Sequence, residues 1–290
     1  MKPGMPRGLA ALLVLIPLLG GCAGAVEVPS TPPAPPQAQD RAQAARLYRD
    51  GLRSLNPPRG QPADTERAAA RIEAAAALGD PDAQLMLGMS HLLRQDGGRD
   101  PAAAVPWLHR AAQQGSAEAQ YRLARLIEAG EGTRREPAWA AVWFQRAAER
   151  GHAGAQLGLA MLQVAGEGTP RDEAEALARL AAAQRGGVTS ARRYRDALAP
   201  RVPRAAAQQA AARIAGEQVR GPVPAVDRPL VRFTQSALAS RGAWQGATDG
   251  RDGPQIRAAL AEHARREGIR AAGPYDPAVI ENLRAAVAPR

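Results

Sequence analysis

The chain has few of the residues that β-rich or disulfide-linked proteins need. Aromatic residues make up 3% of its 290 residues, and Cys22 is the only cysteine, so no disulfide can form within the chain. A β-rich fold would need more valine, isoleucine, tyrosine and phenylalanine. Hydrophobic residues reach 45% largely through alanine, which has the best helix propensity. This composition predicts an all-α protein that is long enough for two packed units.

Lysine is also nearly absent. Lys2 is the only lysine among the 38 basic residues, and the formal charge is +10. An arginine-rich surface can attract an anionic polymer or a membrane, but a solvated surface is the simpler interpretation. The sequence has no nucleic-acid recognition motif and no aromatic cluster for base stacking. We therefore expect no nucleic-acid partner.

Motifs for catalysis and metal binding are missing as well. No zinc-ligand spacing, nucleophile elbow, phosphate loop or dinucleotide fingerprint occurs. Asp249 and Asp252 lack the alternation and the closing glutamate of an EF-hand, so we expect a tight turn there. Each histidine falls in or beside a predicted helix without a partner motif. These are His91, His109, His152 and His263. The sequence predicts a protein that is not an enzyme and uses no cofactor or metal.

The N-terminus has the layout of a secretion signal. Lys2 and Arg7 precede a short apolar run at residues 8–19, broken only by Pro17, and small residues follow. A spanning helix needs about 20 apolar residues, so this run is too short to cross a membrane comfortably. We therefore predict that residues 1–21 are a signal peptide.

The end of this signal, Leu-Gly-Gly-Cys at residues 19–22, resembles the lipobox of bacterial lipoproteins. The resemblance implies cleavage before Cys22 and a diacylglycerol on its thiol, which anchors the protein through its acyl chains. Cleavage removes two basic residues, so the formal charge falls from +10 to +8. Ala23 in place of aspartate favours the outer membrane, with the protein on the periplasmic face of the envelope. The alternative is an ordinary signal peptide with an incidental cysteine.

A proline-rich linker is expected over residues 22–40. Residues 29–39 read PSTPPAPPQAQ, and proline fixes φ and lacks an N–H donor, which excludes helix and central strand. This composition predicts a semi-rigid, extended spacer that lifts the folded part off the membrane.

A period of 36 residues runs through the middle of the chain. Each unit is predicted to contain two helices, as at residues 117–129 and 137–150, with a Gly-Glu-Gly break at residues 130–132. Neither helix pair can bury its apolar stripe alone, so stacked neighbours must form a continuous core. The recurring positions include Gly79, Gly115, Gly151 and Gly187; Gln84, Gln120 and Gln156; and Trp107 and Trp143.

This pattern resembles the SEL-one-like repeat, a relative of the tetratricopeptide repeat. The resemblance covers residues 79–187, with diverged helix pairs at 45–78 and 191–216. It implies a right-handed α-solenoid over residues 41–219 that binds unidentified envelope proteins through its concave face. Two departures are that the first full unit lacks the Gly-x-Gly in phase and that Arg179 replaces tryptophan in the third. The repeated residues themselves are expected to be packing residues.

Three prolines fall within a predicted linker at residues 220–229, and helices are expected at 231–241, 255–267 and 277–287. Residues 230–290 resemble a small three-helix peptidoglycan-binding domain. The matching positions are Gln235, Leu238, Gly242, Trp244, Asp249-Gly250 and Gly253-Pro254. The resemblance implies that peptidoglycan is a partner and that the candidate binding residues are Gln235, Trp244, Asp249 and Gly250. His263-Ala264 stands where the family usually has an aromatic-Gln pair.

Together these features predict a lipid-anchored scaffold or adaptor of the cell envelope. It would bind partner proteins through its helical repeats and contact peptidoglycan through its C-terminal domain. One alternative is a periplasmic regulator of an envelope sensor or secretion system that does not bind the wall. Another is an accessory subunit of a cell-wall hydrolase.

Overall fold

The computed structural model describes residues 26–29, 38–59, 61–93, 98–217 and 219–288. Cys22, the signal peptide and residues 30–37 of the linker lie outside these ranges. The described residues form α-helices, one 3₁₀ turn and no strand, which confirms the all-α prediction. None of these helices is long and apolar enough to cross a membrane. Their bounds are α2 Ala38–Leu55, α3 Thr65–Ala77, α4 Pro81–Leu92, α5 Pro101–Gln113, α6 Ala117–Ala129, α7 Pro137–Glu149, α8 Ala153–Ala165, α9 Glu173–Arg185, α10 Ala191–Leu198, η1 Ala199–Arg201, α11 Arg204–Ala215, α12 Arg228–Ser240, α13 Pro254–Arg266 and α14 Pro277–Val287.

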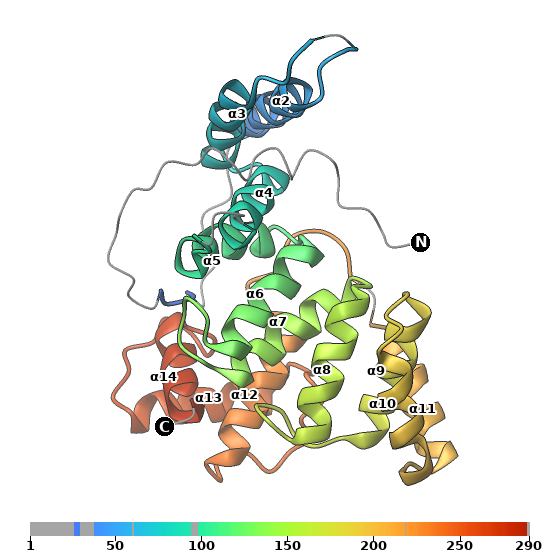
Figure 1. Cartoon of the computed structure of the whole chain (residues 1–290). Helices are drawn as coiled ribbons and strands as arrows, with labels where there is room; N and C mark the ends of the chain where they lie inside the picture. The colour runs from blue at the N-terminus through green and yellow to red at the C-terminus, as the bar shows by residue number, and fades with distance from the viewer. Residues whose placement is uncertain (1–25, 30–37, 60, 94–97, 218, 289–290) are drawn as a thin grey trace.

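Helices α2 to α9 pack one after another into a solenoid of helix–turn–helix units, and α10 and α11 both pack on α9 at its end (Figure 1). Helices α4, α6 and α8 are the first helices of the three full units, and α5, α7 and α9 are the second helices. The predicted bounds of α6 are correct, and α7 ends one residue earlier than expected. Helix α2 begins at Ala38, so Gln39 is helical and not part of an extended spacer.

The repeated glutamines join one unit to the next. Each side-chain amide donates to a backbone carbonyl in the last turns of the preceding helix, eight residues earlier. Carbonyls in the last turn of a helix have no partner within the helix, so the amide satisfies a group that would otherwise be buried unpaired. The bonds are Gln84 to Ala76 (3.0 Å), Gln120 to Ala112 (2.9 Å) and Gln156 to Ala148 (3.0 Å).

The second glycine of each Gly-x-Gly break allows two units to approach closely. Gly132 has φ +70°, and a Cβ there would lie 2.3 Å from the carbonyl carbon of Pro101 at the start of α5. Gly168 has φ +68° and meets Pro137 at the start of α7 in the same way. Both the left-handed backbone and the lack of space require glycine. The corresponding break of the first unit lies partly outside the described residues.

The three C-terminal helices do not form a separate body at the end of the solenoid. Helices α12 and α14 pack on α7, and the buried residues of α12–α14 belong to one core with those of α5–α8. Figure 1 shows α12–α14 beside the middle units, whereas α10 and α11 lie at the far end of the array. The predicted bounds of these helices differ from the observed ones by at most three residues.

The chain reaches this position by running back along the array after α11. The N–H of Val219 donates to the carbonyl of Glu149 in α7 (3.0 Å), and the N–H of Val223 donates to Gln113 in α5 (2.9 Å). Gln113 and Glu149 occupy equivalent places in successive units. The chain that follows α11 is therefore bonded to the ends of two second helices, in the order opposite to that of the repeats, and only Val223 of these two donors belongs to the predicted linker.

Candidate functional site

The face formed by the second helices α7 and α9 is covered by the C-terminal helices. We call this contact the docking interface: α7 and α9 on one side, and α12, α14 and residues 217 and 219–227 on the other. Its aromatic half lies on α7, where Trp139 and Trp143 are buried. Phe233 of α12 meets Trp139 edge-on, with ring centroids 5.5 Å apart and planes at 73°. Such an edge-to-face pair adds to the gain from burying both rings.

Two buried arginines cover these tryptophans. The guanidinium of Arg284 in α14 lies 4.7 Å from the Trp139 ring, and that of Arg146 lies 4.5 Å from Trp143. Each arginine also makes a two-pronged pair with a carboxylate across the interface. Arg146 contacts Asp227 at 2.7 and 3.0 Å. These pairs fix the angle at which the C-terminal helices meet α7.

Glu136 shows how the repeat is adapted for this contact. Asp100, Glu136 and Asp172 occupy the same position, immediately before the second helix of each unit. The side chains of Asp100 and Asp172 cap their helices. Glu136 makes no cap bond and instead accepts from Arg284 at 2.9 and 3.1 Å. In the middle unit, the residue before the second helix therefore bonds to the C-terminal domain and does not cap its own helix.

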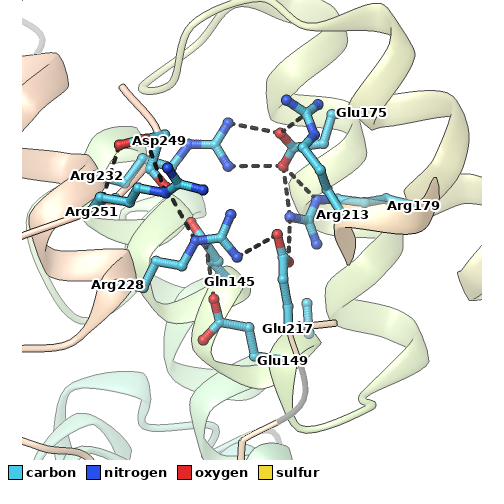
Figure 2. A network of polar contacts seen from close by, with 12 residues as sticks. Gln145, Glu149, Glu175, Arg179, Arg213, Glu217, Arg228, Arg232, Asp249 and Arg251 are labelled. Carbon is cyan, nitrogen blue, oxygen red and sulfur yellow. Dashed lines mark hydrogen bonds and ion pairs between the residues drawn. The ribbon is translucent and has the colours of Figure 1, made fainter. Parts of the chain in front are cut away.

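The ionic half of the interface lies on α9 (Figure 2). Arg179 is completely buried, donates to Glu175 at 2.7 Å and contacts Glu217 at 3.1 Å. Arg232 of α12 makes two bonds to Glu175, at 2.8 and 2.9 Å. Arg228 contacts Glu217 at 2.6 Å. Buried charges are tolerated when they are paired and hydrogen-bonded, as these are.

This network keeps Glu175 ionised. Burial acts to raise the pKa of Glu175, but the hydrogen bonds from Arg232 and the charge of Arg179 hold the pKa well below its usual range. Arg179 is the residue that replaces tryptophan in the third unit. Its departure from the repeat pattern is explained by the two carboxylates that receive its guanidinium.

Glu149 lies at the end of α7, near Arg228. Its carboxylate accepts from Gln145 at 3.1 Å and borders a cavity of about 310 Å³ that Glu217, Asp227 and Arg228 also line. Burial and the neighbouring charge of Glu217 raise the pKa of Glu149 to about 7. Glu149 is thus a carboxyl group that changes charge near neutral pH, where the returning chain meets the array.

The structure brings together three of the four candidate peptidoglycan-binding residues. Gln235 is buried in α12, and its side chain accepts from the N–H of Gly250 (2.8 Å) and donates to the carbonyl of Arg251 (3.2 Å). The Gln235 amide also lies 3.4 Å from Asp249. The Gln235 amide therefore holds the 249–251 loop against α12. Trp244 lies earlier in the same α12–α13 connection, and its indole donates to the carbonyl of Ala247 at 3.1 Å.

A hollow on the C-terminal domain lies away from those three residues. It has a volume of about 320 Å³ and is formed by the end of α12, the turn after it and one side of α13. His263 lines it and shares a hydrogen bond of 2.9 Å with Asn282. Two arginines at its rim, Arg241 and Arg266, are paired with Glu267 and Glu262. Most of the residues that line the hollow are polar or charged.

The first helices carry a different cluster, which no C-terminal helix covers. Tyr121 of α6 stacks on His152, the residue before α8, with centroids 4.4 Å apart. His152 contacts Glu118 at 2.9 Å, and Arg122 contacts Glu118 at 2.6 Å. The hydrogen bond with His152, and the charge of Arg122, lower the pKa of Glu118 to about 2. We call these four partly exposed residues the first-helix cluster.

The remaining two histidines, His91 and His109, contact other residues of the fold. His109 is buried against Trp143, with centroids 5.6 Å apart, and shares a bond with Gln113. Burial and the charge of Arg146 lower its pKa to about 4, so His109 is neutral at physiological pH. His91 also has a partner. Within the described ranges, no three His, Cys, Asp or Glu residues are placed to hold a metal ion.

Comparison with known families matches residues 81–116, 117–152 and 153–184 to the Sel1 repeat. The chain therefore contains three Sel1 repeats, which agrees with the resemblance seen in the sequence. Proteins with these repeats generally mediate protein–protein interaction, and the fold is typically a non-catalytic scaffold. The three matched segments correspond to α4–α9, the part of the array that carries both the docking interface and the first-helix cluster.

The solved structures that are similar to this chain include two with such repeats. One is a protective antigen present in uropathogenic Escherichia coli strains, which displays an SLR fold; it is 22% identical, with a TM-score of 0.49 over 64% of this chain and 43% of that one. The other is a Sel1 repeat protein from Oxalobacter formigenes, 26% identical, with a TM-score of 0.39 over 45% of this chain and 95% of that one. The match thus spans less than half of the first structure's length. No curated protein matches.

Proposed function

We propose that this protein is a lipid-anchored scaffold of the cell envelope that binds partner proteins through the first helices of its Sel1 repeats. One observation carries the proposal. The protein's own C-terminal domain covers the face of α7 and α9, whereas α6 and the N-cap of α8 present the first-helix cluster to solvent. A repeat array with one face occupied by its own chain has the other face for partners.

The chemistry of the first-helix cluster fits such a role. Tyrosine and arginine are enriched among the residues that contribute most to protein interfaces. Tyr121 is held by its stacking on His152, and Arg122 lies 5.6 Å from the tyrosine ring and pairs with Glu118. Side chains that are already ordered lose less entropy when a partner binds. A partner with an acidic or aromatic group opposite Arg122 is the best match.

Site-specific photocrosslinking in cells tests this assignment. A photoreactive residue at Arg125, exposed on α6, should crosslink to one discrete partner protein, and the matched position Arg265, exposed on α13, should not. Tyr121→Ala should then abolish the crosslink from Arg125. A discrete crosslink from Arg265 alone would move the partner surface to the C-terminal domain and overturn the assignment.

The envelope part of the proposal concerns the anchor and the wall. Lipid on Cys22 would hold the protein at the membrane, and the 320 Å³ hollow beside α13 is where the C-terminal domain would contact peptidoglycan glycan. Support comes from the lipobox-like residues 19–22 and from the polar lining of the hollow. Metabolic labelling with a fatty-acid analogue tests the first claim, since Cys22→Ser should lose all label.

Wall binding is best tested with the full chain. A truncation before α12 would expose Trp139 and the core shared with α12–α14, and would make the protein adhesive. The soluble Cys22→Ser protein should instead pellet with peptidoglycan sacculi at moderate salt. Arg241→Ala, in the hollow, should reduce pelleting, and the control Arg251→Ala, whose side chain is exposed in the 249–251 loop, should not. If both variants pellet equally at low salt and neither pellets at moderate salt, the contact with the wall is only a nonspecific electrostatic attraction of the arginines.

A further inference from the structure

Residues 26–29, which we call the strap, are bound to the folded protein although the sequence places them in a linker. The N–H of Val26 donates to the carbonyl of Gly132, in the loop between α6 and α7, at 2.9 Å. The carbonyl of Val28 accepts from Arg284 of α14 at 2.6 Å. The Val28 residue is only 1% exposed, and it belongs to the core shared by the repeats and α12–α14.

The end of the strap lies against α5. The backbone of Pro29 lies beside the His109 ring and acts to raise the pKa of His109, although burial lowers that pKa by more. The strap therefore touches α5, the α6–α7 loop and α14 at once, and Figure 1 shows it beside α14 and that loop, away from α10 and α11. Two hydrogen bonds and one buried side chain define its place, so the strap gives the chain a fixed point of exit near Gly132.

This exit point limits how far the protein can lie from its anchor. Four residue steps separate Cys22 from Val26, and a fully extended chain covers at most about 3.6 Å per residue, or about 14 Å in total. A free linker over residues 22–40 could reach about four times as far. The strap thus removes most of the spacer that the proline-rich composition predicts.

We propose that the strap fixes which surface of the protein faces the membrane, and that the α6–α7 loop with the adjoining end of α14 lies against the lipid headgroups. This inference rests on the proposed lipid at Cys22. Arg134 and Arg135 of this loop are exposed, and Arg99 beside it pairs with Glu131 at 2.5 Å. Arginine side chains of this kind bind headgroup phosphates while their stems cover apolar surface. Helices α10 and α11 point away from the bilayer.

Fluorescence quenching in reconstituted vesicles tests the orientation. Cys22 is the only native cysteine, so once it carries lipid an introduced cysteine is the only free thiol for labelling. Arg135→Cys places a fluorophore in the α6–α7 loop, and the matched control Gln208→Cys places one on the exposed side of α11. With headgroup-nitroxide lipids in phosphatidylethanolamine–phosphatidylglycerol vesicles, the label at 135 should be quenched several-fold more than the label at 208.

Two further variants separate the strap from the anchor. A flexible 20-residue insertion after Cys22 leaves the strap intact and lengthens the tether, and should bring quenching at 135 down to the level at 208. Val28→Asp should have the same effect by releasing the strap. Protein that fails to float with the vesicles would refute the lipid anchor itself. Protein that floats with equal quenching at both positions would refute the orientation and leave the anchor standing.

Discussion

Helices α7 and α9 occupy the same place in successive Sel1 repeats but present opposite chemistry to the C-terminal domain. Trp139 and Trp143 of α7 are replaced, 36 residues on, by Glu175 and Arg179 of α9. One helix, α12, meets the first residue of each pair with adjacent side chains: Phe233 packs on Trp139, and Arg232 pairs with Glu175. The repeat thus sets the backbone, and a few side chains on the second helices determine where the domain binds.

The two halves of the docking interface should respond differently to change. Apolar packing is non-directional, and cores tolerate swaps that keep volume. A buried ion network tolerates little, because removing one member leaves an uncompensated charge. We therefore expect the aromatic half to contribute affinity, and the ionic half to fix the register of α12 against the array.

The largest expected effect is on the ionic half. Arg179→Met leaves Glu175 and Glu217 with fewer partners in a buried site and should destabilise the protein by about 3–5 kcal/mol. Urea unfolding measured by circular dichroism checks the value. A variant that also changes Glu175 and Arg232 to methionine removes most of the stranded charge and should recover much of the loss. If Arg179→Met alone costs less than about 1 kcal/mol, the network is not the determinant described here.

The next effect sharpens the comparison with α5, which has Gln113 where α7 has Glu149. The pKa of Glu149 is raised to about 7 from 4.5, so the folded state holds a proton that the unfolded chain loses. Stability from this group is full below pH 4.5 and is lost as the pH rises through 7. The Glu149→Gln variant should thus have a free energy of unfolding about 2 kcal/mol higher than that of the natural protein at pH 8, with little difference at pH 5.

Urea unfolding at the two pH values is the measurement for Glu149→Gln. Gln113→Ala, at the equivalent place in α5, serves as the control, because no ionisable group is added or removed there. Equal stability differences at pH 5 and pH 8 for Glu149→Gln would contradict the raised pKa.

A smaller effect is expected on the aromatic half. Phe233→Leu keeps an apolar side chain against Trp139 but loses the edge-to-face contact, and should cost about 1–1.5 kcal/mol. The comparison fails if this change costs more than Arg179→Met in the same urea titration. Equal costs would mean that α12 is held uniformly along its length.

The sequence predicts the repeats well because their signals are local and periodic. Gln120 and Gly132 recur at a fixed spacing, and each satisfies a contact with the neighbouring unit. The docking interface joins residues such as Glu136 and Arg284, which are 148 positions apart and follow no period. One signal did point to it: Arg179 in a core position requires a buried counter-charge from elsewhere.

The candidate peptidoglycan residues show a related limit of sequence reasoning. Resemblance to a family singles out Gln235, Asp249 and Gly250. In the structure, the Gln235 side chain holds the loop that contains the other two residues. Residues that hold a fold together recur in a family as reliably as residues that bind its ligand. The strap was hidden for another reason, because proline-rich composition describes the free chain and not the contacts of Val28.

The smallest expected effect concerns an exposed ion pair, and comparison with a buried pair tests whether burial determines the strength of such pairs. Arg135–Glu167 and Arg146–Asp227 are both arginine–carboxylate pairs between neighbouring parts of the fold, but the side chains of the first are 45% and 43% exposed and those of the second 4% and 12%. Water and salt screen the exposed pair, so Arg135→Ala should cost less than about 0.5 kcal/mol, and high salt should erase even that. Arg146→Ala should cost several-fold more and depend little on salt, because Asp227 would be left buried and unpaired. Equal costs in urea unfolding at low and high salt would mean that pairing and not burial holds the C-terminal domain on the repeats.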